Sequence, residues 1–143
     1  RPQVPPDRRR SMIIVNTSSV LASRRILVVE DEPLVAMLEE DLLLEAGAEI
    51  VGPATSVAQA LTLIGDGDLD GAVLDVNLGE ETAFPVAERL TELGVPFVFV
   101  TGYGRQGLIE RHAHRPVIRK PFKPQEFAKD VAMALMRGPA RAD

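Results

Sequence analysis

Acidic, hydroxyl and ammonium side chains stand where short apolar segments of this chain end. The set consists of Glu30, Asp31, Glu32, Asp75, Thr101 and Lys120. Grouped carboxylates repel one another unless a cation joins them, and oxygen ligands with few nitrogen donors favour Mg²⁺. Beside such an ion one carboxylate can act as a nucleophile and form an acyl phosphate, while a lysine and a hydroxyl neutralise charge on the transferred group. These residue types therefore indicate phosphoryl transfer assisted by Mg²⁺.

Any one of these acids has a simpler explanation, because an acid after an apolar segment often caps a helix or starts a turn. Asp31, followed by Glu32 and Pro33, fits a helix N-terminus well. The complete set, in this order on alternating elements, favours a shared site over separate caps.

The elements that must position this set begin with five short apolar segments that are typical of β-strands. Three of them are almost wholly apolar, as expected for strands that are buried on both faces. The predicted strands are Ile26–Val29, Glu49–Val51, Ala72–Val76, Phe97–Val100 and Pro116–Ile118.

Helical patterns alternate with these strands. The first has Pro33 at its start and Gly47 at its end, and its Leu34, Leu38, Leu42 and Ala46 are predicted to fall on one face. The pattern at 106–113 is weak and predicts a short or irregular fourth helix. The predicted helices are Leu34–Ala46, Val57–Ile64, Phe84–Leu93, Gln106–Ala113 and Gln125–Arg137.

Strict alternation of strands and helices predicts an α/β fold, a doubly wound, five-stranded parallel sheet with helices on both faces. In open sheets of this kind ligands bind beyond the carboxyl ends of the strands. The acids, the hydroxyl and the ammonium should therefore meet at one edge of the sheet.

The length of 143 residues suits one domain. Residues 1–23, with several prolines and the run Arg8–Arg10, predict a flexible tail or linker, and 139–143 a short C-terminal tail. The domain should therefore span 24–138.

Acidic residues are concentrated in the first half of the domain. Residues 26–88 contain fifteen Asp or Glu and no Lys or Arg, and the net charge is −5. This negative potential suits a divalent cation and repels nucleic-acid phosphates, so no nucleic-acid partner is expected. An acidic helical surface without a ligand is the alternative.

Composition excludes several other classes of site. The chain has no cysteine and only two histidines, so a disulfide or thiolate site is excluded and a multi-histidine metal site is disfavoured. No apolar run approaches the roughly 18 residues of a membrane span. Met12–Val15 is too short for a signal peptide core. We expect a cytoplasmic protein without a membrane partner.

Four short motifs resemble the receiver domain of two-component response regulators. They are Ile-Leu-Val-Val-Glu-Asp-Glu-Pro at 26–33, Leu-Asp-Val-Asn-Leu at 74–78, Phe-Val-Thr-Gly at 99–102 and Lys-Pro-Phe at 120–122. The resemblance covers about residues 25–137 and implies the flavodoxin-like form of the predicted fold.

The resemblance also implies a role for each site residue. Asp75 corresponds to the phosphoacceptor, and the Lys120–Pro121 bond is expected to be cis. The implied Mg²⁺ ligands are Asp31, Asp75, the backbone carbonyl of Asn77 and, through water, Glu30. The phosphoryl group would be bound by Thr101 and Lys120.

The chain departs from this family where many members carry an aromatic switch residue. That position is Val117, so a ring cannot turn inward there. Tyr103 could take over this function or simply pack on its loop, and both interpretations stay open. A Phe-x-Thr-Gly motif followed by Tyr is similar to one branch of receivers.

Partners follow from the resemblance. A histidine kinase or a phosphotransfer protein would supply the phosphoryl group, and a downstream protein would read the switched surface of this bacterial, non-enzymatic signalling domain. The chain would be a stand-alone regulator or the C-terminal receiver of a hybrid kinase.

Particular residues argue against three other functions. A phosphohydrolase with an aspartyl nucleophile would have Asp-x-Asp at the end of the first strand, where this chain has Glu30-Asp31-Glu32. A docking module without metal does not need the complete acid, Thr and Lys set. Gly-Tyr-Gly-Arg-Gln-Gly at 102–107 matches a dinucleotide motif, but Arg119 and Lys120 stand where an acid is needed.

Overall fold

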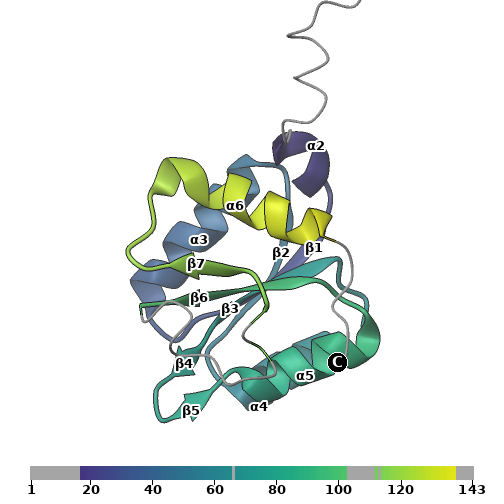
Figure 1. Ribbon diagram of the computed structural model, residues 1–143, viewed down its shortest axis with the longest axis vertical. Helices are drawn as coiled ribbons and strands as arrows, with labels where there is room; N and C mark the ends of the chain where they lie inside the picture. The colour runs from purple at the N-terminus through teal and green to yellow at the C-terminus, as the bar shows by residue number, and fades with distance from the viewer. Residues whose placement is uncertain (1–16, 66, 103–111, 113, 138–143) are drawn as a thin grey trace, which may run out of the picture.

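A parallel five-stranded sheet forms the centre of the computed structural model, which describes residues 17–65, 67–102, 112 and 114–137 (Figure 1). Its strand order is β2-β1-β3-β6-β7, and each neighbouring pair is parallel. The strands are β1 (Arg25–Val29), β2 (Glu49–Ala54), β3 (Gly71–Asp75), β6 (Phe97–Thr101) and β7 (Val117–Arg119). The predicted sheet is confirmed, with strand ends that differ by up to three residues.

Helices cover both faces of the sheet, as predicted (Figure 1). On one face, side chains such as Leu27, Leu74 and Phe99 pack with the helices α4 and α5, and on the other, Ile26 and Val73 pack with α2, α3 and α6. This alternation follows from the two-residue repeat of a strand. The helices are α2 (Thr17–Leu21), α3 (Pro33–Glu45), α4 (Val57–Ile64), α5 (Phe84–Leu93) and α6 (Pro124–Met136).

The predicted helix 106–113 lies outside the described residues, apart from His112. The small antiparallel pair β4 (Asn77–Leu78) and β5 (Glu81–Thr82) was not predicted. Each of its strands has two residues, which is too short for a periodic pattern to indicate. The Lys120–Pro121 bond is cis, which confirms the expectation, and Gly52–Pro53 is also cis.

The apolar face predicted for the first helix is buried only at Ala46. Leu34 is 80% exposed and Leu38 is 39% exposed, whereas the buried residues of α3 are Ala36, Glu39 and Leu43. Apolar side chains of this helix project from most of its sides, so its sequence allowed more than one buried stripe. The sheet and α6 select the stripe that the helix buries.

The predicted tail extends too far toward the domain. Residues 17–21 form the helix α2, and Leu21 is completely buried in the core that α3 and α6 share. The backbone N–H of Ser23 donates to the carbonyl of Gly47 at 2.8 Å. The end of the predicted tail is therefore part of the packed structure, because one large apolar side chain anchors it.

Candidate functional site

The carboxyl ends of the parallel strands form a cleft at the edge from which β4 and β5 project (Figure 1). Asp75 and Thr101 are the last residues of β3 and β6, while Glu30 and Lys120 directly follow β1 and β7. The cleft has a volume of about 540 Å³. Its lining residues are Asp31, Glu32, Asp75, Asn77, Gly79, Gly102 and Lys120.

Three carboxylates in this cleft are close enough to share a cation. Oxygen atoms of Glu30, Asp31 and Asp75 all lie within 4.8 Å of one another. Glu30 is completely buried and Asp75 is 5% exposed. A set of carboxylate oxygens with so little water around it fits a hard divalent cation such as Mg²⁺.

Lys120 neutralises part of this negative charge. Its Nζ lies 2.9 Å from Glu30 Oε1 and 3.5 Å from both Asp75 Oδ2 and Glu32 Oε1. The other carboxylate oxygen of Glu30 accepts a hydrogen bond from the backbone N–H of Glu32 at 3.2 Å. Glu30 therefore links the turn after β1 to the turn after β7.

The pKa values of the two central groups reflect this crowding. Burial is the main cause that raises the pKa of Asp75, and with the hydrogen bond and charge of Glu30, against the opposing charge of Lys120, that pKa is about 7. Burial lowers the pKa of Lys120, but the hydrogen bond to Glu30 and the charges of Asp75, Glu30 and Glu32 together outweigh burial and raise it. The cluster thus has more negative charge than one lysine balances, and a cation would relieve it.

Thr101 ends β6 directly before Gly102, which lines the cleft, and Asn77 lines the cleft from β4. Thr101 is 1% exposed, and its carbonyl accepts the backbone N–H of Lys120 at 2.9 Å. Asn77 is exposed, belongs to β4 and lines the cleft. The residues that were predicted from strand ends therefore occupy one site, whereas Tyr103 lies outside the described residues.

Glu39 is a residue of this neighbourhood that the sequence analysis missed. It is 1% exposed, and both of its carboxylate oxygens lack a hydrogen-bond partner among the described residues. Burial is the main cause that raises its pKa, and with the charges of Glu30, Asp75 and Glu40, against that of Lys120, the pKa is about 8. Ala36 and Leu43, at spacings of three and four, would have indicated that an acid stands in a buried stripe.

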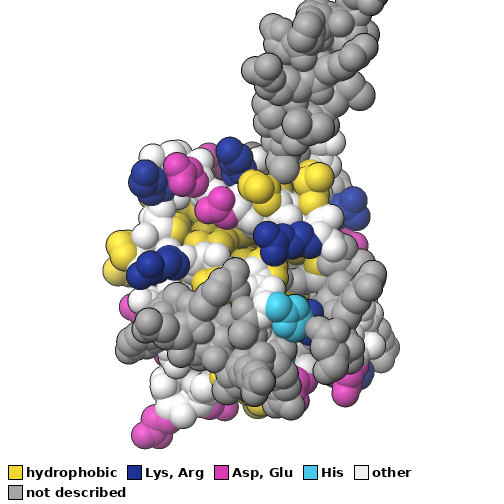
Figure 2. Space-filling model, viewed as in Figure 1, with side chains coloured by type: hydrophobic (Ala, Val, Ile, Leu, Met, Phe, Trp, Pro, Cys, Tyr) yellow, Lys and Arg dark blue, Asp and Glu magenta, His cyan; other side chains and the backbone are white. Residues whose placement is uncertain are grey.

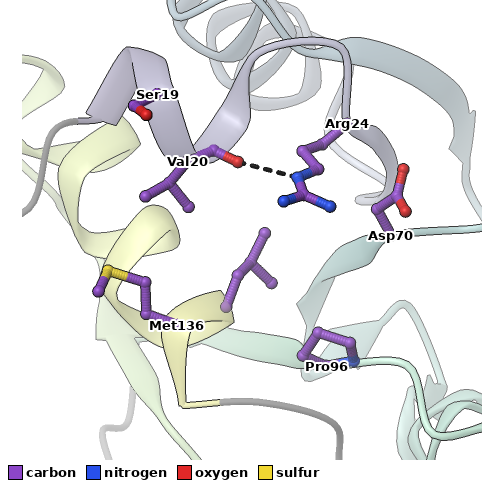
Figure 3. A pocket seen from close by; sticks show the side chains of 7 residues that line it. Ser19, Val20, Arg24, Asp70, Pro96 and Met136 are labelled. Carbon is purple, nitrogen blue, oxygen red and sulfur yellow. Dashed lines mark hydrogen bonds between the residues drawn. The ribbon is translucent and has the colours of Figure 1, made fainter.

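A second cleft lies at the opposite ends of the strands and is separate from this chemistry (Figure 3). Arg24, Asp70 and Pro96 each directly precede a strand, and the Nε of Arg24 donates to the carbonyl of Val20 at 3.1 Å. The lining residues are Ser19, Val20, Arg24, Asp70, Pro96, Leu135 and Met136. None of the clustered acids reaches it.

Charged side chains of both signs are interspersed on the face that Figure 2 displays. A continuous basic stripe, as nucleic-acid binding requires, is not visible there. Among the described residues, no helix is long and apolar enough to cross a membrane.

Comparisons with known proteins show which domain family this chain is similar to. The family model of the response regulator receiver domain matches residues 26–132. The solution structure of SdrG from Sphingomonas melonis Fr1 has 45% sequence identity and a TM-score of 0.69, and the match covers 82% of this chain and 98% of that one. The crystal structure of the response regulator PhyR from Brucella abortus has 26% identity and a TM-score of 0.71, over 85% of this chain and 51% of that one.

A curated relative is longer than this chain. The phyllosphere-induced regulator PhyR of Methylorubrum extorquens is 32% identical over 114 residues, which are 77% of this chain and 43% of that protein. The chain spans about half the length of the first curated relatives that it matches.

Proposed function

Because this chain belongs to the family of response regulator receiver domains, we propose that Asp75 accepts a phosphoryl group from a histidine kinase or a phosphotransfer protein. The observation that carries this proposal is the position of Asp75 at the end of a buried strand. There its carboxylate shares one cleft with two further acids and lies 3.5 Å from the ammonium of Lys120.

The transfer forms one bond and breaks one. An oxygen of the Asp75 carboxylate attacks the phosphorus of a phosphohistidine, and the bond from phosphorus to the imidazole nitrogen breaks. The electron pair of that bond stays on the imidazole, and Asp75 becomes an acyl phosphate. Attack requires the deprotonated carboxylate, and a nearby positive charge favours that form because it opposes the burial that raises the pKa of Asp75.

The residues around Asp75 divide the remaining work. Asp31, Asp75 and the backbone carbonyl of Asn77 would hold Mg²⁺, with Glu30 acting through water. When bound, the ion would neutralise charge on the phosphoryl oxygens. Lys120 balances the charge of Asp75 and of the transferred group, and the hydroxyl of Thr101 donates to a phosphoryl oxygen.

We propose that the domain, which includes the helix α2 before residue 24, supports only its own phosphorylation and dephosphorylation, in the cytoplasm where kinases find their substrates. The added charge would bias a surface that a downstream protein binds, either in a stand-alone regulator or in the receiver of a hybrid kinase. Continuous turnover of a small phosphomonoester would instead indicate a phosphohydrolase.

The exposed face of α3 is the surface that we assign to the phosphodonor protein. Leu34 is 80% exposed and Met37 is 58% exposed, and α3 begins two residues after Asp31, which lines the cleft. A protein that delivers a phosphoryl group to Asp75 must cover this rim. Leu34→Asp should abolish transfer from a histidine kinase that phosphorylates the wild type, but leave phosphorylation by a small acyl phosphate unchanged. Equal loss with both donors would contradict the assignment.

Intact mass tests the phosphoacceptor directly. After incubation with Mg²⁺ and acetyl phosphate, the wild type should gain one phosphoryl group, and a chelator should prevent the gain. Asp75→Asn should gain none, whereas the control Asp41→Asn, an exposed acid on α3, should behave like the wild type. Phosphorylation of Asp75→Asn at the wild-type rate would disprove the assignment.

A further inference from the structure

The strand β6 connects the site to an aromatic cluster. Thr101 is the last residue of this strand and lies at the site. Phe97 and Phe99 precede it at two-residue spacing, so the three side chains project toward the same face of the sheet. Phe97 and Phe99 pack in the core beneath α4 and α5. A change in the position of Thr101 therefore acts on the strand that carries these two rings.

His112 closes this cluster from outside the sheet. It is 2% exposed. Its ring stacks on Phe84 of α5 with centroids 5.3 Å apart, and it meets Phe99 edge-on with centroids 5.6 Å apart. Contacts of this geometry between rings are stabilising beyond their buried area. His112 thus joins α5 to the strand that ends in Thr101.

The rings that contact Phe99 belong to Phe84, Phe97 and His112, and none comes from β7. Val117 is the register partner of Phe99 on β7, and it packs half-buried against the same cluster. Valine has no ring to place there. His112, five residues earlier in the chain, supplies an aromatic contact that Val117 cannot make.

Further contacts fasten the segment after His112 to the same strand. Arg115 is 8% exposed, its guanidinium carbon lies 5.3 Å from the centroid of the Phe97 ring, and its Nη2 donates to Thr91 Oγ1 at 3.2 Å. The backbone N–H of Phe99 donates to the carbonyl of Pro116 at 3.0 Å. Arg115 and Pro116 therefore follow the position of β6.

We propose that His112 is an aromatic positioning residue that couples Thr101 to the exposed surface of residues 114–119. The proposal rests on the proposed phosphorylation of Asp75. A phosphoryl group draws the hydroxyl of Thr101 toward it, β6 carries that shift to Phe99, and the ring contact passes it to His112. The exposed side chains of His114 and Arg119 then present a surface that depends on the state of Asp75.

The ring signals of the two histidines test this in the unaltered protein. Beryllofluoride binds a carboxylate and mimics an acyl phosphate, and it is added together with Mg²⁺. The NMR signals of the ring protons and backbone amides are recorded before and after the addition. The variant His114→Ala serves to assign the two histidine rings. We expect the His112 ring signal and the Thr101 amide signal to shift together, and neither to shift in Asp75→Asn. A shifted Thr101 amide with an unchanged His112 ring overturns this inference alone, whereas no change at Thr101 overturns the proposed function as well.

Variants separate coupling from mere packing. His112→Ala should keep the beryllofluoride shift at Thr101 but lose most of the shift at the amides of Arg115 and Val117. His112→Phe should retain it. The double variant His112→Ala/Val117→Phe should restore it, since a ring from the segment that carries the exposed surface again contacts Phe99, in addition to Phe84 and Phe97. A wild-type response in His112→Ala contradicts the proposal. If this variant does not fold, the ring signal of the wild type decides.

Discussion

The carboxyl group of Glu39 is buried beside the acids of the cleft, without a hydrogen bond among the described residues. An ionised carboxylate in such a place costs free energy, so the folded protein favours the protonated form. The raised pKa of Asp75 has the same main cause, burial. Burial thus favours the protonated form of both residues, although only Asp75 lines the cleft.

This burial predicts a pH-dependent stability. The pKa of Glu39 is about 8 in the folded protein and 4.5 ordinarily, so between these values the folded state keeps a proton that the unfolded state releases. The free energy of unfolding should fall as pH rises through this window and level off above it. Glu39→Gln should remove that part of the decline. Between pH 5 and pH 8 the free energy of unfolding of this variant should rise, relative to that of the wild type, by on the order of a few kcal/mol.

Denaturant unfolding at several pH values measures this difference. Asp75 titrates in the same range in both proteins, so the comparison with Glu39→Gln removes its contribution to first order. Glu45→Gln, an exposed residue of the same helix, is the matched control and should follow the wild type. If the free energies of unfolding of Glu39→Gln and the wild type change in parallel with pH, Glu39 is not held protonated in the folded protein.

Among the elements, α3 has two different apolar surfaces. Its inner stripe, Ala36, Glu39 and Leu43, lies against the sheet and α6, while Leu34 and Met37 face outward beside the cleft. The outer residues contribute little to the core. Because they are exposed, these residues are better explained by contact with another protein than by a contribution to the stability of the fold.

Two leucines of this helix should therefore differ strongly in their effect on stability. Leu43→Ala removes a completely buried side chain and should cost about 2–5 kcal/mol of unfolding free energy. Leu34→Ala, at a position that is 80% exposed, should change it by no more than about 0.5 kcal/mol. Chemical denaturation of both variants checks this, and similar losses would mean that the helix packs by another stripe.

At the scale of the whole molecule, charge is divided unequally along the chain. Fifteen acids and no basic residue lie in residues 26–88, and Lys120 reaches back from the other half to the acids of the cleft. Three close carboxylates oppose folding unless a cation accompanies them. The clustered carboxylates of the site therefore lower the stability of the domain, as functional sites commonly do.

Mg²⁺ should consequently stabilise the whole domain against heat. A ligand that binds only the folded state at about one hundred times its dissociation constant adds roughly 2.7 kcal/mol. Asp31→Asn should lose most of this gain and, without Mg²⁺, should melt above the wild type because one repelling charge is gone. Asp41→Asn should respond like the wild type. Melting curves with and without Mg²⁺ measure this, and an undiminished gain in Asp31→Asn would exclude Asp31 as a ligand.

The sequence by itself determined the sheet and the edge at which the chemistry lies. Buried parallel strands are short apolar runs, so their ends could be located within a few residues, and Asp75 and Thr101 stand at such ends. Parallel strands bring their carboxyl ends together whatever the details of packing. The resemblance of the four motifs to receiver domains added the individual roles, and the family itself is confirmed.

Only the tertiary structure decided which side chains are buried and what they touch. The stripe that α3 buries, the isolation of Glu39 and the ring contacts of His112 depend on neighbours that are distant in the sequence. Local periodicity describes one element at a time, whereas burial depends on how two or more elements pack. For this reason the strand ends could be predicted from the sequence, and the charge balance and the aromatic connection around them could not.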